Sequence, residues 1–318
     1  MSRFSVALVL ALIFCARLCA ENLVYIFDGP TNNTHLAILK GANDALKDFN
    51  LRYGKNFKAV DFSQGKGDIS QAQLLKEAAK DPQNIGAAVI PLEGSKGELE
   101  AQVILLASKK FPTIALAFPL NQEGALQTIS ISKDDLLKRL TLDLNSKKDR
   151  AKFQILAVIS GKDDAFIDEK QALESLSGIK RDVAEALLKI APVKFISASH
   201  FSEFQKKYAA ELLALDNYSL VFLSELPLND VSPLAEDSDR LSAVSIGGNP
   251  YMAQYLNSKQ ITLVAMPDYY GFGYLSAVAL VEKYMQNKLP SAKLRNLDSS
   301  FFTPLDIGEF NKAWINLN

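Results

Sequence analysis

Short apolar runs alternate with amphipathic stretches along most of this chain, and the pattern is clearest over residues 241–290. Two strand-like runs, 241–246 and 261–266, enclose a short helical stretch, and a longer amphipathic stretch begins at Gly271. Strand, helix, strand and helix in this order predict a parallel α/β sheet. Ligands bind beyond the carboxyl ends of such strands, so we expect a site near residues 249 and 266–270.

The first part of the chain repeats this alternation at short intervals. Helices are expected from about residue 35, around Leu74 and Leu75, and over residues 96–110. The strands between them are apolar, which is typical of strands buried on both faces of a doubly wound sheet. They are expected at residues 23–27, 57–62, 87–91 and 113–118.

The second part carries a separate alternation. A short run at residues 126–132 leads into a helix at 133–145, and further helical patterning covers about 166–190 and 203–215. Apolar strands are expected at residues 153–160, 193–198 and 219–223, ahead of the two runs already described. We therefore predict an α/β protein with two lobes, each built on its own parallel sheet.

Residues 1–20 have the pattern of a secretory leader. Arg3 precedes an apolar run from residue 6 to residue 16, which is too short to span a bilayer comfortably. Ala20 then stands before polar Glu21, as at a cleavage point. We expect a signal peptide at residues 1–20 and a periplasmic location, and an uncleaved anchor stays open as the alternative.

The composition argues against several kinds of function. Both cysteines, Cys15 and Cys19, lie within the leader, so residues 21–318 offer no disulfide, no thiol nucleophile and no thiolate ligand for a metal. The net charge is −1 and lysines are interspersed with acids, which argues against binding to nucleic acid. Residues 21–318 are numerous enough for two lobes with sizeable interiors.

Short motifs add a resemblance to a known family. One strand ends in Gly-Gly-Asn-Pro at 247–250, and the next ends in Met-Pro-Asp at 266–268, with Gly-Tyr at 273–274. Near the start, Asn-Asn-Thr-His at 32–35 precedes Gly-Ala at 41–42. In architecture these stretches resemble the type I periplasmic binding proteins, the ribose- and galactose-binding group.

The resemblance implies two doubly wound parallel-sheet lobes joined by a three-stranded hinge, with a small ligand captured between them. The first lobe would hold residues 21–128 plus 265–298, and the second residues 129–264 plus 299–318. Ligand contacts would come from strand ends and the loops that follow them. In this sequence these positions are Asp28, Asn32, Asn33, His35, Asp68, Glu93, Phe118, Glu225, Asn249, Met266 and Tyr269. Simpler roles stay open for three of them: Asn32 and Asn33 only cap a helix, and Glu225 is only a solvated loop acid.

Asn249 and Met266 are among the positions that depart from the family's pattern. Asn249 stands where the family has an aspartate, and Met266 stands where it has a glutamine. A buried hydroxyl that loses its hydrogen-bond partner costs roughly 1–3 kcal/mol, so several such losses would weaken a sugar site by orders of magnitude. We therefore expect a small-molecule ligand other than a common hexose or pentose.

The sequence offers little for catalysis. Its two histidines, His35 and His200, are not near a Gly-x-Ser-x-Gly turn, and Gly-Phe-Gly at 271–273 lacks the third glycine of a dinucleotide fingerprint. No cluster of side chains has metal-ligand spacing. We expect a monomeric binding protein that is not an enzyme and has no cofactor and no metal. Besides the ligand, its partner would be a membrane protein, either the permease of an ABC importer or a sensor kinase.

Overall fold

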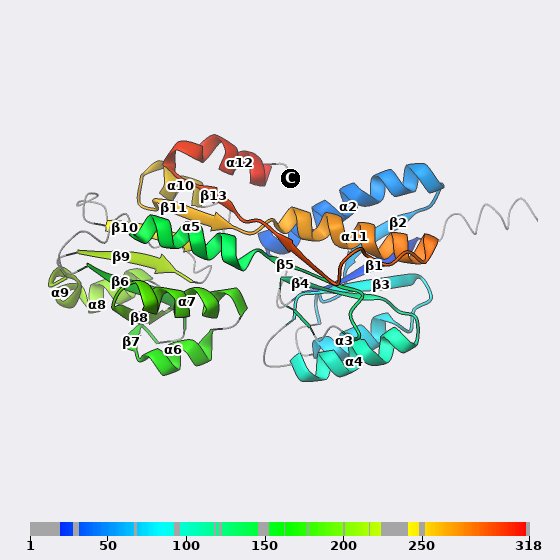
Figure 1. The fold of residues 1–318 in the computed structure, drawn as a ribbon, viewed down its shortest axis with the longest axis horizontal. Helices are drawn as coiled ribbons and strands as arrows, with labels where there is room; N and C mark the ends of the chain where they lie inside the picture. Colours follow the sequence, from blue (N-terminus) through cyan, green and yellow to red (C-terminus); the bar gives the residue numbers. More distant parts are fainter. Residues whose placement is uncertain are drawn as a thin grey trace, which may run out of the picture. The chain divides into compact units, whose positions relative to one another are not determined.

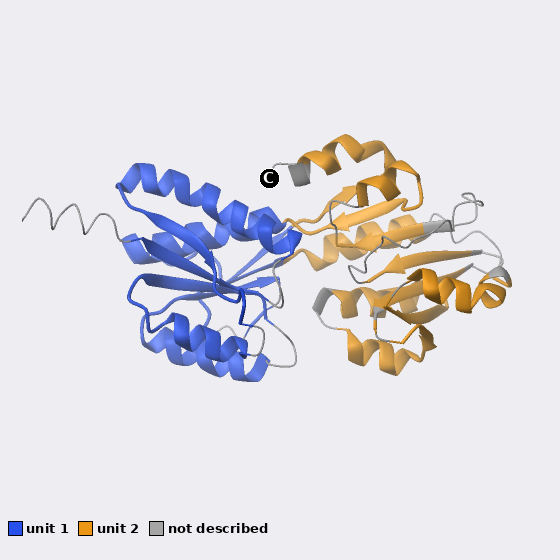
Figure 2. Cartoon of the chain, turned by 180° about the vertical axis from the view of Figure 1, so that it is seen from behind, with its two compact units in different colours: residues 1–130, 269–297 blue, residues 131–268, 298–318 orange. Residues whose placement is uncertain are grey.

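The chain folds into two compact units. The computed structural model describes residues 20–27, 32–66, 69–91, 96–117, 119–120, 123–145, 153–161, 163–176, 178–199, 201–215, 217–223, 241–247 and 252–315. Unit 1 contains residues 1–130 and 269–297, and unit 2 contains residues 131–268 and 298–318 (Figure 2). The chain therefore passes from one unit to the other three times.

Unit 1 is built on a sheet whose described strands follow the order β12-β5-β4-β3-β1-β2. Every neighbouring pair from β5 to β2 is parallel. β3 is buried along its whole length, as expected for a central strand covered on both faces. The strands are β1 (Glu21–Ile26), β2 (Phe57–Asp61), β3 (Asn84–Val89), β4 (Thr113–Ala117), β5 (Gln127–Ile131) and β12 (Leu294–Leu297).

Helices cover both faces of the unit 1 sheet (Figure 1). α2 (Asn33–Tyr53) and α11 (Tyr269–Gln286) lie side by side on one face. α3 (Gln71–Ala78) and α4 (Lys96–Ser108) cover the other face, where their leucines pack against aliphatic residues of β1 and β3. The amphipathic pattern of the sequence thus becomes a three-layered unit with the sheet in the middle.

α2 and α11 cross at two glycines. A Cβ atom on Gly41 would overlap the carbonyl oxygen of Tyr270, and one on Gly273 would overlap the carbonyl oxygen of Ile38. Because glycine has no Cβ, the two helix backbones can approach each other closely here. Both glycines lie in the first half of their helices, so the N-terminal turns of α2 and α11 lie together at one end of the sheet.

Unit 2 is built on a second sheet, with the order β13-β11-β10-β9-β6-β8-β7 among the described residues. Its central strands are parallel, whereas β7 pairs antiparallel with β8 and β13 pairs antiparallel with β11. The predicted parallel sheet is thus confirmed, and it carries one antiparallel strand at each edge. The strands are β6 (Phe153–Ser160), β7 (Ala165–Ile167), β8 (Val193–Ala198), β9 (Asn217–Phe222), β10 (Leu241–Ile246), β11 (Leu263–Met266) and β13 (Ser300–Phe302).

The helices of unit 2 bury leucines against this sheet. Leu136 and Leu140 of α5 join Leu187 of α7 in one cluster with the central strands. The helices are α5 (Lys133–Asn145), α6 (Glu169–Ser175), α7 (Gly178–Ile190), α8 (Phe201–Lys207), α9 (Ala209–Leu213), α10 (Met252–Asn257) and α12 (Ile307–Ile315), with a 3-10 turn η4 (Pro304–Asp306) before the last. η4 and α12 belong to the last segment of the chain, after α11.

Two helical predictions in unit 2 need correction. The stretch at 166–190 is not one helix, because its apolar start pairs with β8 as β7 and Asp168 then caps α6 by accepting a hydrogen bond from the Gln171 N–H. The stretch at 203–215 is divided at Tyr208, which leaves the helical conformation between α8 and α9. Periodicity alone did not predict either interruption.

Candidate functional site

The carboxyl edge of the unit 1 sheet, where β1 and β3 end, is held by a buried amide. Gln71 Nε2 donates one hydrogen bond to the carbonyl oxygen of Phe27 at 3.1 Å and another to that of Ile90 at 2.7 Å. On the other side of β1, Ser63 Oγ accepts from the Phe27 N–H and donates to Asp61. The backbone of Phe27 is therefore fixed from two neighbouring strand ends.

The first turn of α2 packs directly on this fixed residue. The His35 ring stacks on the Phe27 ring with 4.1 Å between centroids, and His35 is only 2% exposed. Asn32 is the N-cap of α2, since its Oδ1 accepts a hydrogen bond from the His35 N–H at 3.0 Å. The simpler role that the sequence allowed for Asn32, helix capping, is thus observed. Its role toward a ligand stays a prediction.

The start of α11 reaches the same end of unit 1. Tyr269 is the first residue of α11, and its ring and the buried Phe272 ring are edge-to-face with 6.2 Å between their centroids. Because Tyr270 lies against Gly41, the first turn of α11 lies beside the first turns of α2. Asn32, Asn33, His35 and Tyr269, which are far apart in the sequence, therefore share one end of unit 1.

β4 ends in an unusual backbone conformation. Ala117 has φ +64°, in the left-handed region that a residue with a Cβ seldom adopts. Ser130 Oγ donates a hydrogen bond to the Ala117 carbonyl oxygen at 2.9 Å, which holds the peptide in place. Such conformations concentrate at ligand-binding positions, and Phe118, a predicted ligand contact, is the next residue.

The strand ends of unit 2 are also organised by short hydrogen bonds. Asp164, in the loop after β6, accepts hydrogen bonds from both the N–H and the hydroxyl of Ser199 after β8. Gly247 follows β10 with φ +95°, and its carbonyl oxygen accepts a hydrogen bond from buried Ser245. Met266 is the last residue of β11 and is 9% exposed. It belongs to unit 2, whereas Tyr269, three residues later, belongs to unit 1.

No protein-family model and no curated protein sequence matches this chain. Solved structures do match. GanP, a glucose-galactose binding protein from Geobacillus stearothermophilus, is 16% identical, and the match covers 90% of this chain and 98% of that one with a TM-score of 0.65. A carbohydrate transporter solute binding protein from Agrobacterium radiobacter, solved in complex with D-arabinose, is 11% identical, with coverage of 95% and 100% and a TM-score of 0.68. The chain has the type I periplasmic-binding-protein fold.

Proteins with the type I fold do not all have the same biological role. A putative LacI transcriptional regulator from Bacteroides fragilis matches as well, at 9% identity, with coverage of 91% and 99% and a TM-score of 0.67. The names of these three proteins describe binding or regulation rather than catalysis. At these identities the likeness establishes the fold, and the use of the fold has to be argued from the residues.

Six of the predicted contacts on this type I fold lie outside the described residues: Asp28, Asp68, Glu93, Phe118, Glu225 and Asn249. They stay predictions, as do the ligand roles of the five that are described. Sequence reasoning missed Phe27, Ser63 and Gln71, which shape the carboxyl edge of unit 1. Gln71 stands one residue after the Ser70 cap of α3, where a glutamine is usually solvated, so nothing in the pattern signalled its burial.

Internal hydrogen bonds and a ring contact order the described carboxyl edge of unit 1. Within them there is no group of His, Cys, Asp and Glu side chains that could hold a metal ion. Of the helices in this part of the chain, none is both long enough and apolar enough to cross a bilayer.

Proposed function

We propose that this protein is a periplasmic solute-binding protein that captures a small ligand between its two lobes and presents it to a membrane ABC importer. The observation that carries the proposal is the construction of two sheet-based units by a chain that passes between them three times. In parallel α/β sheets ligands bind at the carboxyl edge, and here that edge carries the ordered polar and aromatic residues of unit 1. Ligand binding would favour a closed form by hinge motion, and the membrane partner would read that form.

The proposed ligand is a small molecule other than a common hexose or pentose. Met266 ends β11 with an apolar side chain where the resembling sugar-binding family has a glutamine. A thioether is at best a weak acceptor, so this position cannot replace an amide that both donates and accepts. Aromatic residues around the start of α11 favour a flat or cationic ligand instead.

A thermal-shift screen of the mature chain tests the proposal. The panel should contain sugars, nucleosides, amino acids, amines and N-oxides, because a ligand that binds only the folded state raises the melting temperature. Asn249→Ala and Asp28→Ala should reduce the shift given by the best ligand. Asn257→Ala, at the exposed end of α10, is a matched control that should leave the shift unchanged.

Different outcomes test different parts of the proposal: the site residues, the absence of catalysis, and the membrane partner. A shift that survives both Asn249→Ala and Asp28→Ala would show that the ligand site is assigned to the wrong residues. Recovery of a chemically altered ligand after incubation would show an enzyme instead of a binding protein. Loss of uptake of the ligand on deletion of the gene supports delivery to an importer, whereas unchanged uptake with a lost transcriptional response favours the sensor-kinase output.

A further inference from the structure

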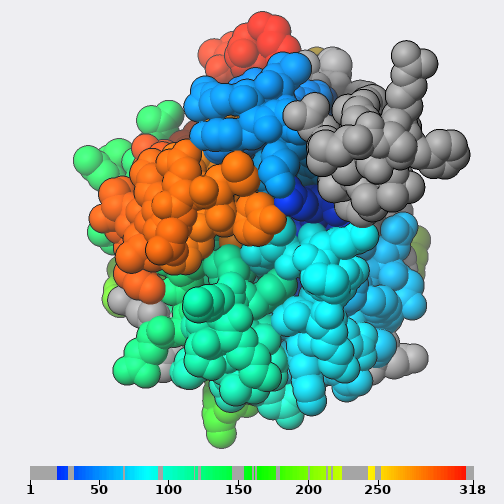
Figure 3. Space-filling model, turned by 90° about the vertical axis from the view of Figure 1, so that its right-hand side faces the viewer, coloured from blue at the N-terminus to red at the C-terminus, as the bar shows by residue number. Residues whose placement is uncertain are grey.

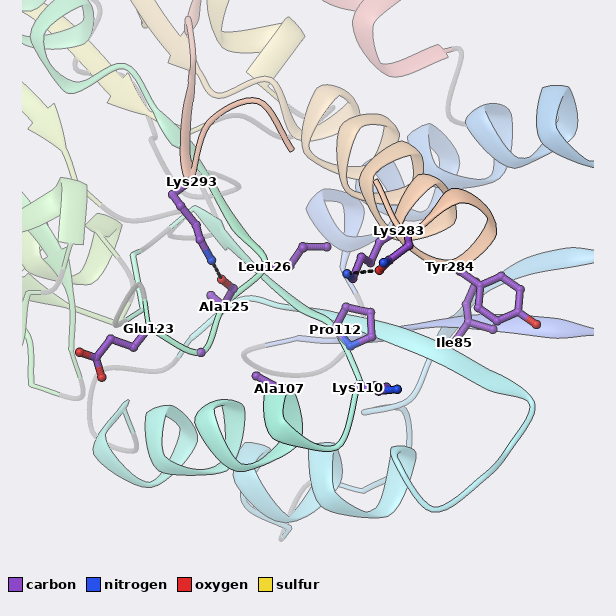
Figure 4. A pocket seen from close by; sticks show the side chains of 12 residues that line it. Ile85, Ala107, Lys110, Pro112, Glu123, Ala125, Leu126, Lys283, Tyr284 and Lys293 are labelled. Atoms are coloured by element: carbon purple, nitrogen blue, oxygen red, sulfur yellow. Dashed lines mark hydrogen bonds between the residues drawn. The ribbon is translucent and has the colours of Figure 1, made fainter. Parts of the chain in front are cut away.

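A concave surface lies in unit 1, away from the predicted ligand site. It is a groove with a volume of about 550 Å³, large enough for a small organic molecule. Ile85 near the start of β3, Pro112 before β4 and Leu126 before β5 line it, so it lies at the amino edge of the sheet. Together with Tyr284 these residues give the groove an apolar wall (Figure 4).

Charged side chains surround this apolar wall. Three of the lining residues are lysines, Lys110, Lys283 and Lys293, and one is an acid, Glu123. α4 and α11 both end beside the groove, and each helix C-terminus contributes about −0.5 of an elementary charge. The net charge of these side chains and helix ends is therefore about +1, so the groove favours an anion.

The lysines reach the groove from three different segments. Lys293 Nζ donates a hydrogen bond to the Ala125 carbonyl oxygen at 2.7 Å, and Lys283 Nζ contacts Asn287 (Figure 4). An ammonium group has three N–H donors, so one such bond leaves capacity for a bound anion. In the space-filling view, the orange residues of α11 stand next to blue-green and green residues of unit 1 (Figure 3).

Lys110 occupies a position that glycine would fill with less strain. Its φ is +63°, in the left-handed region, at the end of α4 where glycine is the usual residue. Lys259 takes the same conformation after α10, so the backbone by itself does not mark a site. What distinguishes Lys110 is that its side chain lines a groove that already holds two other lysines.

We propose that this groove binds a small molecule with a carboxylate group on an apolar body. The lysines would hold the carboxylate, and Pro112, Leu126 and the ring of Tyr284 would contact the body. The groove is at the edge of the sheet opposite to the predicted solute site. The proposal therefore does not depend on the proposed function.

Benzoate is the probe, and benzamide is its neutral counterpart of the same shape. A ligand-observed NMR titration of the mature chain should show saturable binding of benzoate and weaker binding of benzamide. Lys110→Gly should weaken benzoate binding about fivefold, as expected for loss of one charge pair near the surface. The same variant should melt at the same or a higher temperature, because glycine relieves the left-handed backbone.

Lys109→Ala is the matched control, because it removes the same charge at the adjacent exposed residue, which does not line the groove. It should change the benzoate affinity by less than about twofold. Equal effects of the two variants, or equal binding of benzoate and benzamide, would overturn the proposal. Binding that His35→Ala abolishes and Lys110→Gly preserves would also overturn it, because benzoate would then occupy the opposite edge.

Discussion

The imidazole of His35 lies flat on the ring of Phe27, with 3° between the two planes and 4.1 Å between their centroids. Phe27 follows β1 and His35 is in the first turn of α2, so the stack joins a strand end to the helix that comes after it. Both rings are almost fully buried. The stack therefore packs against the carboxyl edge of unit 1. It holds Phe27 and His35, the two residues that flank the intervening loop, close together.

Replacing His35 by alanine should destabilise unit 1. The change removes the ring contact and leaves a cavity beside Phe27, so the free energy of unfolding should fall by about 2–3 kcal/mol in urea titrations. Leu36→Ala is the matched control, because Leu36 is the next residue of α2 and is 46% exposed. If His35→Ala and Leu36→Ala had the same free energy of unfolding, the ring stack would make no measurable contribution to stability.

Alanine at either glycine of the helix crossing should also destabilise the protein. A methyl group at Gly41 or Gly273 would meet backbone carbonyl oxygens that cannot rotate away, which costs about 1–3 kcal/mol or more. This loss should exceed the gain of up to about 1 kcal/mol that alanine gives within a helix. Gly97→Ala in α4 should show that gain alone, because its added Cβ would meet no atom within 4 Å apart from its chain neighbours and the backbone of its own helix. Denaturation curves in which Gly41→Ala matched Gly97→Ala would contradict the close crossing.

Glycine at Ala117 should stabilise the protein slightly. The left-handed conformation costs about 1 kcal/mol for a residue with a Cβ, and glycine adopts it freely. The melting temperature of Ala117→Gly should therefore rise or stay level. Ala115→Gly, two residues earlier in the same strand, should lower it, because Ala115 is fully buried and lies in regular strand. A fall of equal size in both variants would mean that Ala117 is not strained.

The contribution of Asp44 to stability should depend on pH. A hydrogen bond from Lys47, with further support from Lys40 and from the hydroxyl of Tyr270, holds the pKa of Asp44 below its ordinary value of 3.8. A carboxyl group with a depressed pKa stabilises the folded state above the unfolded pKa, and this stabilisation disappears as pH falls through the folded value. Asp44→Asn should therefore lower the unfolding free energy at pH 7 by less than about 1 kcal/mol, and this effect should shrink as the pH is lowered toward 2.

Asp48→Asn is the control for this pH dependence. Asp48 lies one turn further along α2 and is exposed, so its replacement removes an acid from the same helix and leaves the contacts of Asp44 with Lys47 and Tyr270 in place. Chemical denaturation of the variants and the wild type at the two pH values measures the difference. An Asp44→Asn penalty that persisted in acid would mean that geometry rather than charge makes the contact favourable.

The fold class could be predicted from the sequence because apolar strands and amphipathic helices alternate at short intervals. The bounds of α5, β6, β8 and β10 agree with the predicted ranges, since each has a strong apolar period and a polar end. The pattern failed at β7, whose three residues are too short to show a period and are paired through β8. It also could not show that β11 and α11 belong to different units, because only two residues separate them.

The candidate site was less predictable than the fold. The sequence placed polar residues at strand ends, but it could not show that Gln71 bridges two strand ends or that His35 is buried on a ring eight residues earlier. Both are long-range or loop-spanning contacts, and they depend on how strands are ordered in the sheet. Strand order is set by tertiary packing, which local pattern does not record.

The glycine crossing also constrains when unit 1 can be completed. α2 is made early and α11 late, and the whole of unit 2 except its tail is synthesised between them. Until α11 has been synthesised, the face of α2 that carries Gly41 is exposed, and so is the part of the sheet that α11 covers. Unit 1 can therefore complete its hydrophobic core only after α11 has been synthesised. A shortened chain that stops before residue 269 would expose apolar surface of unit 1 and would be prone to aggregate.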